Sequence, residues 1–387
     1  MRKRKERTMK PDTKKIAFII CINDADAYAE CRYYIDRLKL PDGFNKDIIT
    51  IEDAPSMAAG YNAGMESSNA KYKVYLHQDV MIIDINFIEK LLKVFCSSNS
   101  IGILGCVGAT KLSSDAMAVT SWNVGKVVQN AGPLLLEYEE VSGLYAKVEA
   151  IDGLLMATQH DVRWREDIMD GWDFYDISQC MEFKRNGYLA VVPRQEQPWC
   201  YHDNHSSNME QYNFYRGRFI KEYATDGNFH MPPIWKKGEE YRKLKKQSIN
   251  LMESFIQAGD HTQLHQIFMQ PEYRKYMHLD EYKVIADIDY LEQHAQSEKR
   301  LWQPGANDAA MLLRKIRKLK SILKRIEYCA APTEQAMQQL LSCYSVYAIA
   351  GVFEQYVERR QHVYEEIKSY FIKNQRSELE IWMKLQL

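Results

Sequence analysis

The sequence lacks the marks of several common protein classes. No apolar run is long enough to cross a membrane, and the basic residues 1–5 are not followed by the apolar stretch of a signal peptide. The 51 basic and 52 acidic side chains leave a net charge of −1, so we expect no nucleic-acid partner. The eight cysteines include no Cys-x-x-Cys pair, which predicts reduced, buried thiols and a cytoplasmic protein.

Two signatures of nucleotide-binding folds are absent as well. Residues 102–111 carry glycines and a lysine, but they lack the Gly-Lys-Ser/Thr ending that holds a phosphate on a helix N-terminus. This segment instead predicts a central strand with a closely packed backbone. No Gly-x-Gly-x-x-Gly follows the first predicted strand, which argues against a dinucleotide-dependent enzyme.

The chain is long enough for more than one domain. At 387 residues it exceeds a typical single domain, and a Pro-Pro pair near residue 232 interrupts two helical patterns. We therefore expect a basic disordered tail over residues 1–13, an α/β domain over residues 14–228 and a helical domain over residues 229–387. Contact of the tail with anionic lipid at the inner face of a membrane is left open.

Apolar runs in the first half of the chain alternate with helical patterns. Residues 15–22, 47–51 and 72–76 are short, rich in β-branched or aromatic side chains, and predict strands. The amphipathic stretches 27–38 and 56–67 lie between them and predict helices. Strands that alternate with helices indicate a mainly parallel sheet, at whose carboxyl edge ligands bind.

Each predicted strand ends in polar or acidic residues. The third strand breaks into His77, Gln78 and Asp79, and a carboxylate at that edge can hold Mg²⁺ or Mn²⁺ against a diphosphate. The second strand ends at Glu52 and Asp53, whose carboxylates can accept hydrogen bonds from a uracil imide or a ribose hydroxyl. Alternatively, these residues simply open polar loops.

Four local patterns occur in an order and spacing that resemble a known family. They are Ile22–Asp24, Ala58–Gly64, Leu76–Asp79 and the segment Trp172–Ile177, which leads into Lys184–Tyr188. Together they resemble the family 2 glycosyltransferases of the GT-A fold, in particular the streptomycin-biosynthesis type of glycosyltransferase-2-like domain. The resemblance covers about residues 14–225.

The resemblance implies a fold and an activity. It implies a GT-A (Rossmann-like) mixed, mainly parallel sheet flanked by helices, and an inverting, metal-dependent glycosyltransferase. The enzyme would move a sugar from a nucleotide-diphosphate sugar to an acceptor hydroxyl in bacterial glycan or glycoconjugate biosynthesis, with Mn²⁺ or Mg²⁺ as the cofactor. The acceptor would be a glycan, a lipid-linked molecule or a small molecule.

The resemblance also implies roles for individual residues. Asp79 would bind the metal and His202 would complete the metal or diphosphate shell, while Asp176 would act as the general base. The expected contacts to the donor nucleotide come from Asn23, Asp24, Glu52, Asp53, Asn62, His77 and Gln78. Because the family reads the nucleobase and ribose where Glu52 and Asp53 stand, the resemblance slightly favours UDP as the donor nucleotide. The expected contacts to the acceptor or donor phosphate come from Asp152, Trp172 and Asp173. The variable segment 116–145 and the helical domain would build the acceptor pocket.

The chain departs from the family pattern at two places. His77 stands where the first aspartate of Asp-x-Asp usually contacts the ribose, and Tyr175 and Ser178 occupy positions that are usually acidic. Simpler roles are also open, since Asp176 can cap a helix and Asp152 can open an Asp-Gly turn. His202 and His205 can likewise cap a helix that starts near Ser206.

The second half of the chain predicts a helical bundle with short loops. Helical spacing of apolar residues occurs over residues 239–256, 282–294, 307–328 and 334–371. One apolar stripe, flanked by basic residues, consists of Leu312, Leu313, Ile316, Leu319, Ile322, Leu323 and Ile326. It can lie on an anionic membrane or pack in the bundle, and we favour packing. Homo-oligomerisation through the helical domain is left open.

Two other functions remain as alternatives. The first is a catalytically weakened protein that binds sugar nucleotides and recruits partners through its helical domain. The second is a nucleotidyltransferase on a similar sheet. We rank it last, because Asn23-Asp24-Ala25-Asp26 stands where such enzymes carry a glycine-rich, basic phosphate loop.

Overall fold

The computed structural model divides the chain into two compact units, Met1–Pro232 and Pro233–Leu387. It describes residues 10–129, 135–204, 209–230, 237–268 and 308–328, and the single positions 282, 285, 349 and 352. The predicted tail over residues 1–13 lies largely outside the described residues, although its last two residues already belong to the first strand.

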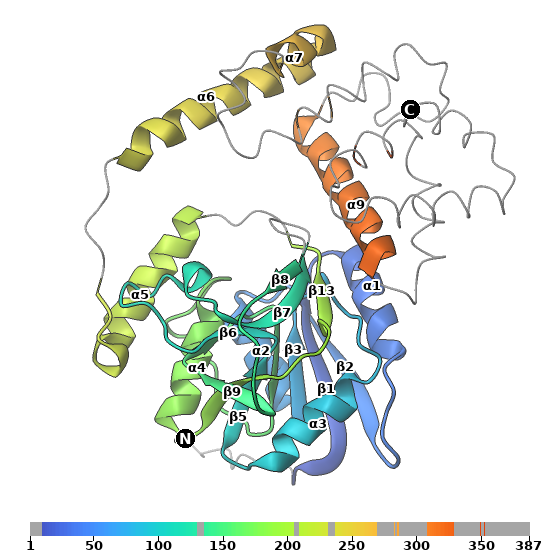
Figure 1. Ribbon diagram of the computed structural model, residues 1–387, viewed down its shortest axis with the longest axis vertical. Helices are drawn as coiled ribbons and strands as arrows, with labels where there is room; N and C mark the ends of the chain where they lie inside the picture. Colours follow the sequence, from blue (N-terminus) through green and yellow to red (C-terminus); the bar gives the residue numbers. More distant parts are fainter. Residues whose placement is uncertain are drawn as a thin grey trace, which may run out of the picture. The chain divides into compact units, whose positions relative to one another are not determined.

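The first unit alternates strands and helices (Figure 1). In chain order its elements are β1 (Asp12–Ile22), α1 (Ala25–Asp36), β2 (Asn45–Glu52), α2 (Met57–Glu66), β3 (Ala70–Leu76), β4 (Val80–Ile82), α3 (Phe87–Ser97), β5 (Ile101–Gly105), β6 (Val107–Ala109), η1 (Ala118–Thr120), β7 (Val124–Gln129), β8 (Leu135–Glu137), β9 (Tyr145–Val148), β10 (Ala150–Ile151), β11 (Leu155–Thr158), α4 (Tyr175–Arg185), β12 (Leu189–Pro193), β13 (Cys200–His202) and α5 (Met209–Gly227). The strands and helices predicted before residue 77 all occur, with ends shifted by three residues at most.

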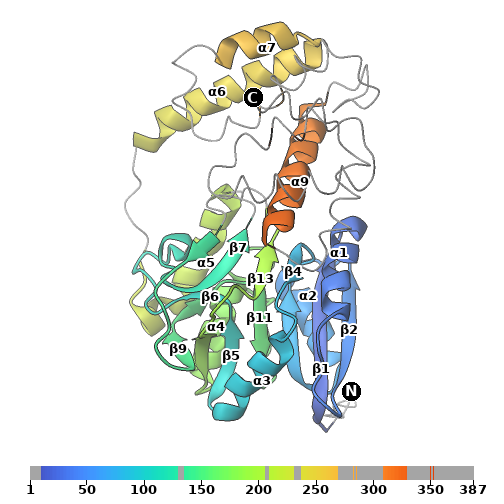
Figure 2. The ribbon, with the colours of Figure 1, turned by 45° about the vertical axis from the view of Figure 1, so that its right-hand side comes forward.

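Seven strands form the central sheet in the order β2-β1-β3-β11-β5-β12-β9. Figure 2 shows β11 in the middle of this sheet, with β1 and β2 to one side and β5 to the other. Strand β1 is parallel to β2 and β3, and β12 is parallel to β5, but β11 runs antiparallel to both of its neighbours. The expected mixed sheet is confirmed, yet it is less parallel than expected. The reason is that β11 enters from the second sheet and not through a helical crossover.

Helices cover both faces of the central sheet. Successive residues of β1 point to opposite faces, so Ile16, Phe18 and Ile20 pack in one core cluster with α1 and α3. Their neighbours Ala17 and Ile19 pack in the other cluster, with α2, α4 and α5. This double burial explains why the strand reads as an unbroken apolar run in the sequence.

Helix α2 lies unusually close to β1. Ser56 caps its first turn by accepting a hydrogen bond from the backbone N–H of Ala59, at 3.1 Å. Gly60 and Gly64 face the strand one turn apart, and a Cβ atom at either position would overlap a β1 side chain. The two glycines of this segment therefore allow the helix to approach the strand closely.

A second sheet brings a distant segment to the end of β3. Its strand order is β10-β6-β7-β13-β4, and β8 pairs with β7. Strand β13 is antiparallel to β4, with His202 opposite Val80. The central strand expected over residues 102–111 is wrong as one element, because it divides into β5 and β6, which join different sheets. The chain breaks in the same way at Glu149, between β9 and β10.

The described part of the second unit is helical, as expected. Its helices are α6 (Lys237–Ala258), α7 (His261–Phe268) and α9 (Ala309–Tyr328). The stripe of α9 is buried from Leu312 to Leu323, which favours packing over a membrane-facing surface. Most of the helices predicted over residues 282–294 and 334–371 lie outside the described residues. Among the described residues, no helix has the length and hydropathy that a membrane span requires.

Candidate functional site

The ends of β1 and β3 are tied together by one side chain. The carbonyl oxygen of the Gln78 side chain accepts hydrogen bonds from the backbone N–H groups of Asn23 and Asp24, at 2.9 and 3.0 Å. Its amide group donates to Asn23 Oδ1 at 2.5 Å. The side chain of Asp24 caps α1 by accepting from the N–H of Ala27. The polar residues that follow two strands thus build one rigid edge.

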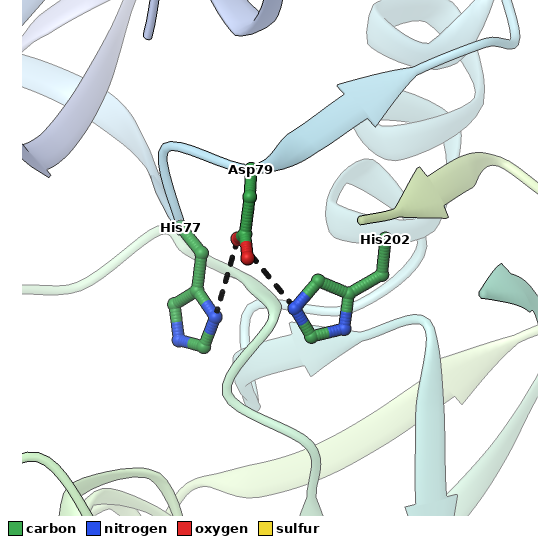
Figure 3. Close-up of side chains that lie close together, drawn as sticks. All are labelled: His77, Asp79 and His202. Atoms are coloured by element: carbon green, nitrogen blue, oxygen red, sulfur yellow. Dashed lines mark ion pairs between the residues drawn. The ribbon is translucent and has the colours of Figure 1, made fainter. Parts of the chain in front are cut away.

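His77, Asp79 and His202 converge beside this edge (Figure 3). Asp79 Oδ1 lies 3.9 Å from Nδ1 of His77 and 3.6 Å from Nε2 of His202. His77 follows β3, Asp79 precedes β4, and His202 ends β13, whose pairing with β4 carries it to this place. All three side chains are partly buried.

The charges in this cluster support one another. Burial raises the pKa of Asp79, but the two imidazoles outweigh burial and hold that pKa at about 2. Burial lowers the pKa of His202, yet the Asp79 charge dominates and the net shift is upward. For His77 the effect of burial prevails, and its pKa is lowered. The site therefore favours an ionised Asp79 carboxylate, and of the two imidazoles His202 holds a proton more readily than His77.

The three side chains fit a divalent cation. Their ligand atoms lie within 4.8 Å of one another. Two nitrogen or oxygen ligands that share an ion at about 2.1 Å are at most about 4.2 Å apart, so small side-chain movements complete the set. Two imidazoles and one carboxylate accept Mn²⁺ more readily than Mg²⁺, which keeps an all-oxygen shell. Among the described residues, no other group of this kind occurs.

Asp176 lies at the start of α4, close to the end of β10. Its Oδ2 accepts a hydrogen bond from the N–H of Gly153 at 2.9 Å, and its Oδ1 accepts from the N–H of Ile177 at 2.8 Å. Asp176 is not the N-cap residue, since that position belongs to Phe174, which is left-handed at φ 63°, but its bond from Ile177 does satisfy one first-turn amide, as the helix-cap alternative expected. Burial and then the charge of Asp152 raise the pKa of Asp176 to about 7.

Two cavities meet at the metal-binding cluster. The smaller has a volume of about 370 Å³ and lies over the strand ends, lined by Asn23, Asp53 and Gln78. The larger has a volume of about 630 Å³ and contains Asp176. His77, Asp79 and Trp172 line both cavities, so the cluster lies at their junction.

The wall of the larger cavity comes largely from the expected acceptor segment and from aromatic residues. The lining residues from the segment 116–145 are Ala118, Val119, Trp122, Val127, Gln129 and Tyr138. Tyr212 of α5 adds another ring and accepts a hydrogen bond from the N–H of Ala118 at 3.0 Å. Asp152 and Asp173 contribute carboxylates.

Three residues expected at the donor nucleotide lie outside the smaller cavity. Asn62 is buried and bonds both the N–H and the carbonyl of Trp164, so its side chain fastens α2 to the segment before α4. Glu52 is exposed at the end of β2, and Asp24 serves as the helix cap described above. His205 lies outside the described residues.

Two contributors to the site were not anticipated from the sequence. Tyr175 was noted only as a departure from an acidic position, yet its hydroxyl lies 2.5 Å from Nε2 of His77. Tyr212 carries no local signal, because the fold of α5 alone brings it to the cavity. His77 was expected to contact the ribose. It stands only two positions before Asp79, however, and this spacing lets both side chains reach one metal ion.

The sequence was also compared with known proteins. Residues 17–223, more than half of the chain, match the model of the glycosyltransferase-like family. The chain belongs to this family. No curated protein matches the sequence.

Solved structures resemble this glycosyltransferase only loosely. TarS of S. aureus aligns at 10% identity with a TM-score of 0.38, covering 85% of this chain, which spans 55% of the TarS chain. The mannosyltransferase PcManGT of Pyrobaculum calidifontis, in complex with GDP-Man and Mn²⁺, aligns at 11% identity with a TM-score of 0.38, covering 74% of this chain and 89% of its own. With scores this low, the ligands of these proteins say nothing about those of this chain.

Proposed function

We propose that this glycosyltransferase is metal-dependent and inverting, and that it transfers a sugar from a nucleotide-diphosphate sugar to an acceptor hydroxyl. The observation that carries the proposal is the position of His77 and Asp79 at the junction of two cavities. A donor in the smaller cavity and an acceptor in the larger one would place the reacting sugar at this junction. The bacterial pathway expected from the resemblance stays a prediction.

The smaller cavity supports a nucleoside diphosphate as donor. Asp53 lines it at the end of β2, where a carboxylate can accept from a ribose hydroxyl or a uracil imide. Among the described lining residues there is no lysine or arginine to neutralise a diphosphate. His77, Asp79 and His202 would hold a divalent cation, which supplies that positive charge to the leaving group. UDP remains the favoured nucleotide.

The larger cavity supports Asp176 as the general base. Its carboxylate would take the proton of the acceptor hydroxyl while the hydroxyl oxygen forms a bond to the anomeric carbon. The bond from that carbon to the diphosphate oxygen breaks, and its electron pair leaves with the diphosphate. A pKa of about 7 suits a base that works near neutral pH. The two backbone N–H groups fix the carboxylate in place. A single displacement of this kind inverts the anomeric centre.

Calorimetric titration tests the donor side directly. UDP, GDP, ADP and CDP would be titrated into the wild type with and without Mn²⁺, and into Asp79→Ala. We expect one nucleotide to bind only with Mn²⁺, and Asp79→Ala to lose this binding. Asp42→Ala is the matched control, because Asp42 lies on an exposed turn and lines neither cavity.

Together with a measurement of sugar transfer, the same titration separates catalysis from nucleotide binding alone. Metal-dependent nucleotide binding without transfer to any acceptor would favour the alternative of a weakened sugar-nucleotide-binding protein. Failure of every nucleotide to bind, with and without metal, would overturn the proposal.

A further inference from the structure

The larger cavity carries negative charge and has no fixed cation of its own. Asp79, Asp152, Asp173 and Asp176 all line it, and none of its described lining residues is a lysine or an arginine. Two segments that directly follow lining residues, 130–134 and 205–208, contain neither residue type in the sequence. The positive charge that the cavity does receive comes from the histidine and metal cluster, which the donor diphosphate would use.

This charge pattern discriminates between classes of acceptor. Sugar hydroxyls donate hydrogen bonds to carboxylates, whereas a phosphate or carboxylate group on the acceptor would lie beside three acidic residues, with no lysine or arginine among the described lining residues. Like charges that are placed together across an interface weaken binding. An anionic acceptor would need an arginine or a lysine, because binding sites usually hold phosphate and carboxylate groups with these side chains.

Trp172 supplies the complementary apolar surface. Its side chain is 43% exposed, which is high for an indole, and it lines both cavities. The preceding residue is Gly171, where a Cβ would overlap the hydroxyl of Tyr215, so the backbone is packed closely while the indole stays open. An exposed aromatic face beside carboxylates is suited to a sugar ring, which has an apolar C–H face and a polar rim.

We propose that the acceptor is an uncharged saccharide, bound in the larger cavity with the apolar face of one ring on Trp172 and its hydroxyls near Asp152 and Asp173. This inference rests on the proposed function, because it assigns the larger cavity to the acceptor. The cavity volume of about 630 Å³ is within the usual range for small-ligand sites.

Saturation-transfer NMR on the full chain tests the inference without any turnover. The probes are matched pairs: methyl glucoside with methyl glucuronide, N-acetylglucosamine with N-acetylmuramic acid, and mannose with mannose 6-phosphate. Each pair is measured with and without Mn²⁺ and a saturating nucleoside diphosphate. In at least one pair we expect the uncharged member to bind at least about tenfold more tightly than its anionic partner.

Variants at two positions assign the effect to residues. Trp172→Ala should weaken binding of the uncharged saccharide about tenfold, and Trp172→Phe should retain most of it. Phe214→Ala is the control, since Phe214 is an exposed aromatic residue that lines neither cavity. Asp173→Asn keeps the shape of the side chain but removes its charge. It should reduce the difference in affinity between the uncharged and the anionic member of each pair.

The outcomes separate this inference from the proposed function. Equal or tighter binding of the anionic partners, or no saturation transfer to any uncharged saccharide, overturns the inference and leaves nucleotide binding intact. Binding of the uncharged saccharide that Trp172→Ala does not weaken, or a preference over the anionic partner that Asp173→Asn does not reduce, also overturns it. If the wild type shows no metal-dependent nucleotide binding, the proposed function is overturned. The saccharide-binding measurements still decide whether the larger cavity prefers uncharged saccharides.

Discussion

The hydroxyl of Tyr175 lies 2.5 Å from Nε2 of His77 and so connects the metal-binding cluster to helix α4. The next residue on that helix is Asp176, the proposed base. Gly153 makes the contact feasible, because a Cβ there would overlap the Tyr175 hydroxyl. A hydrogen bond at Nε2 leaves Nδ1, the nitrogen that faces Asp79, available to a metal.

This relationship predicts that Tyr175→Phe weakens metal binding. The ring packs against Tyr61 and Trp164 and should stay in place, while His77 loses the partner that fixes its orientation. Removal of such a partner typically costs 10- to 100-fold in metal affinity, and we expect at least about tenfold for Mn²⁺. Calorimetry measures the Mn²⁺ affinity, with Tyr33→Phe as the control, because Tyr33 lies on α1 and lines neither cavity. Unchanged Mn²⁺ affinity would show that the contact does not position His77.

The two histidines should determine the preference of the site for Mn²⁺ over Mg²⁺. Imidazole nitrogens favour Mn²⁺ over Mg²⁺, so the wild type should bind Mn²⁺ at least about tenfold more tightly. His77→Asp recreates the Asp-x-Asp pattern of the family and should reduce that ratio, because an oxygen ligand suits Mg²⁺. Competition titrations with both ions give the ratio directly. A ratio that does not change would mean that His77 is not a ligand.

Replacement of the proposed base should separate binding from chemistry. In Asp176→Asn one carboxylate oxygen becomes an NH₂ group, which cannot accept from Gly153 or Ile177. We expect transfer to fall by about 10²- to 10⁴-fold while metal-dependent nucleotide affinity stays within about threefold. Parallel rate and titration measurements check this. Retained transfer at the wild-type rate would assign the base to another residue.

The raised pKa of Asp176 predicts opposite pH trends for activity and stability. As a base it must be ionised, so kcat/KM should fall about tenfold per pH unit below pH 7. Between about pH 4 and about 7 the folded protein keeps a proton that the unfolded chain has released, so this contribution to stability is lost as the pH rises. Asp176→Asn does not titrate, and its melting temperature should rise relative to the wild type across this window. A relative fall would contradict the prediction.

The two glycines of α2 give a prediction about the fold. Gly64→Ala places a Cβ against Ile19 of β1 and should destabilise the protein by about 1–3 kcal/mol. Gly217→Ala is the control, because a Cβ there meets nothing within 4 Å and alanine favours the helix. Urea unfolding of both variants compares them. Equal stability of the two would show that the α2 contact relaxes freely.

Several features of the site follow from the sequence because they are local. Asp79 follows a strand whose apolar run is visible in the sequence, and Asp176 opens a helix with a recognisable pattern. Ser56 and the glycines of α2 likewise mark a helix that the structure confirms. The role of Asn62 could not be predicted, since its partner Trp164 lies far along the chain.

The sequence by itself determined the order of strands and helices up to residue 77, the polar residues at the strand ends, and the helical character of the second unit. Periodicity and caps are properties of neighbouring residues, so they need no knowledge of the fold. Only the tertiary structure decided that Tyr175 reaches His77, and it brought His202 beside Asp79, a pairing that the residues alone did not indicate and only the family resemblance implied. These contacts depend on the pairing of β13 with β4 and the packing of α4, which join residues about a hundred positions apart.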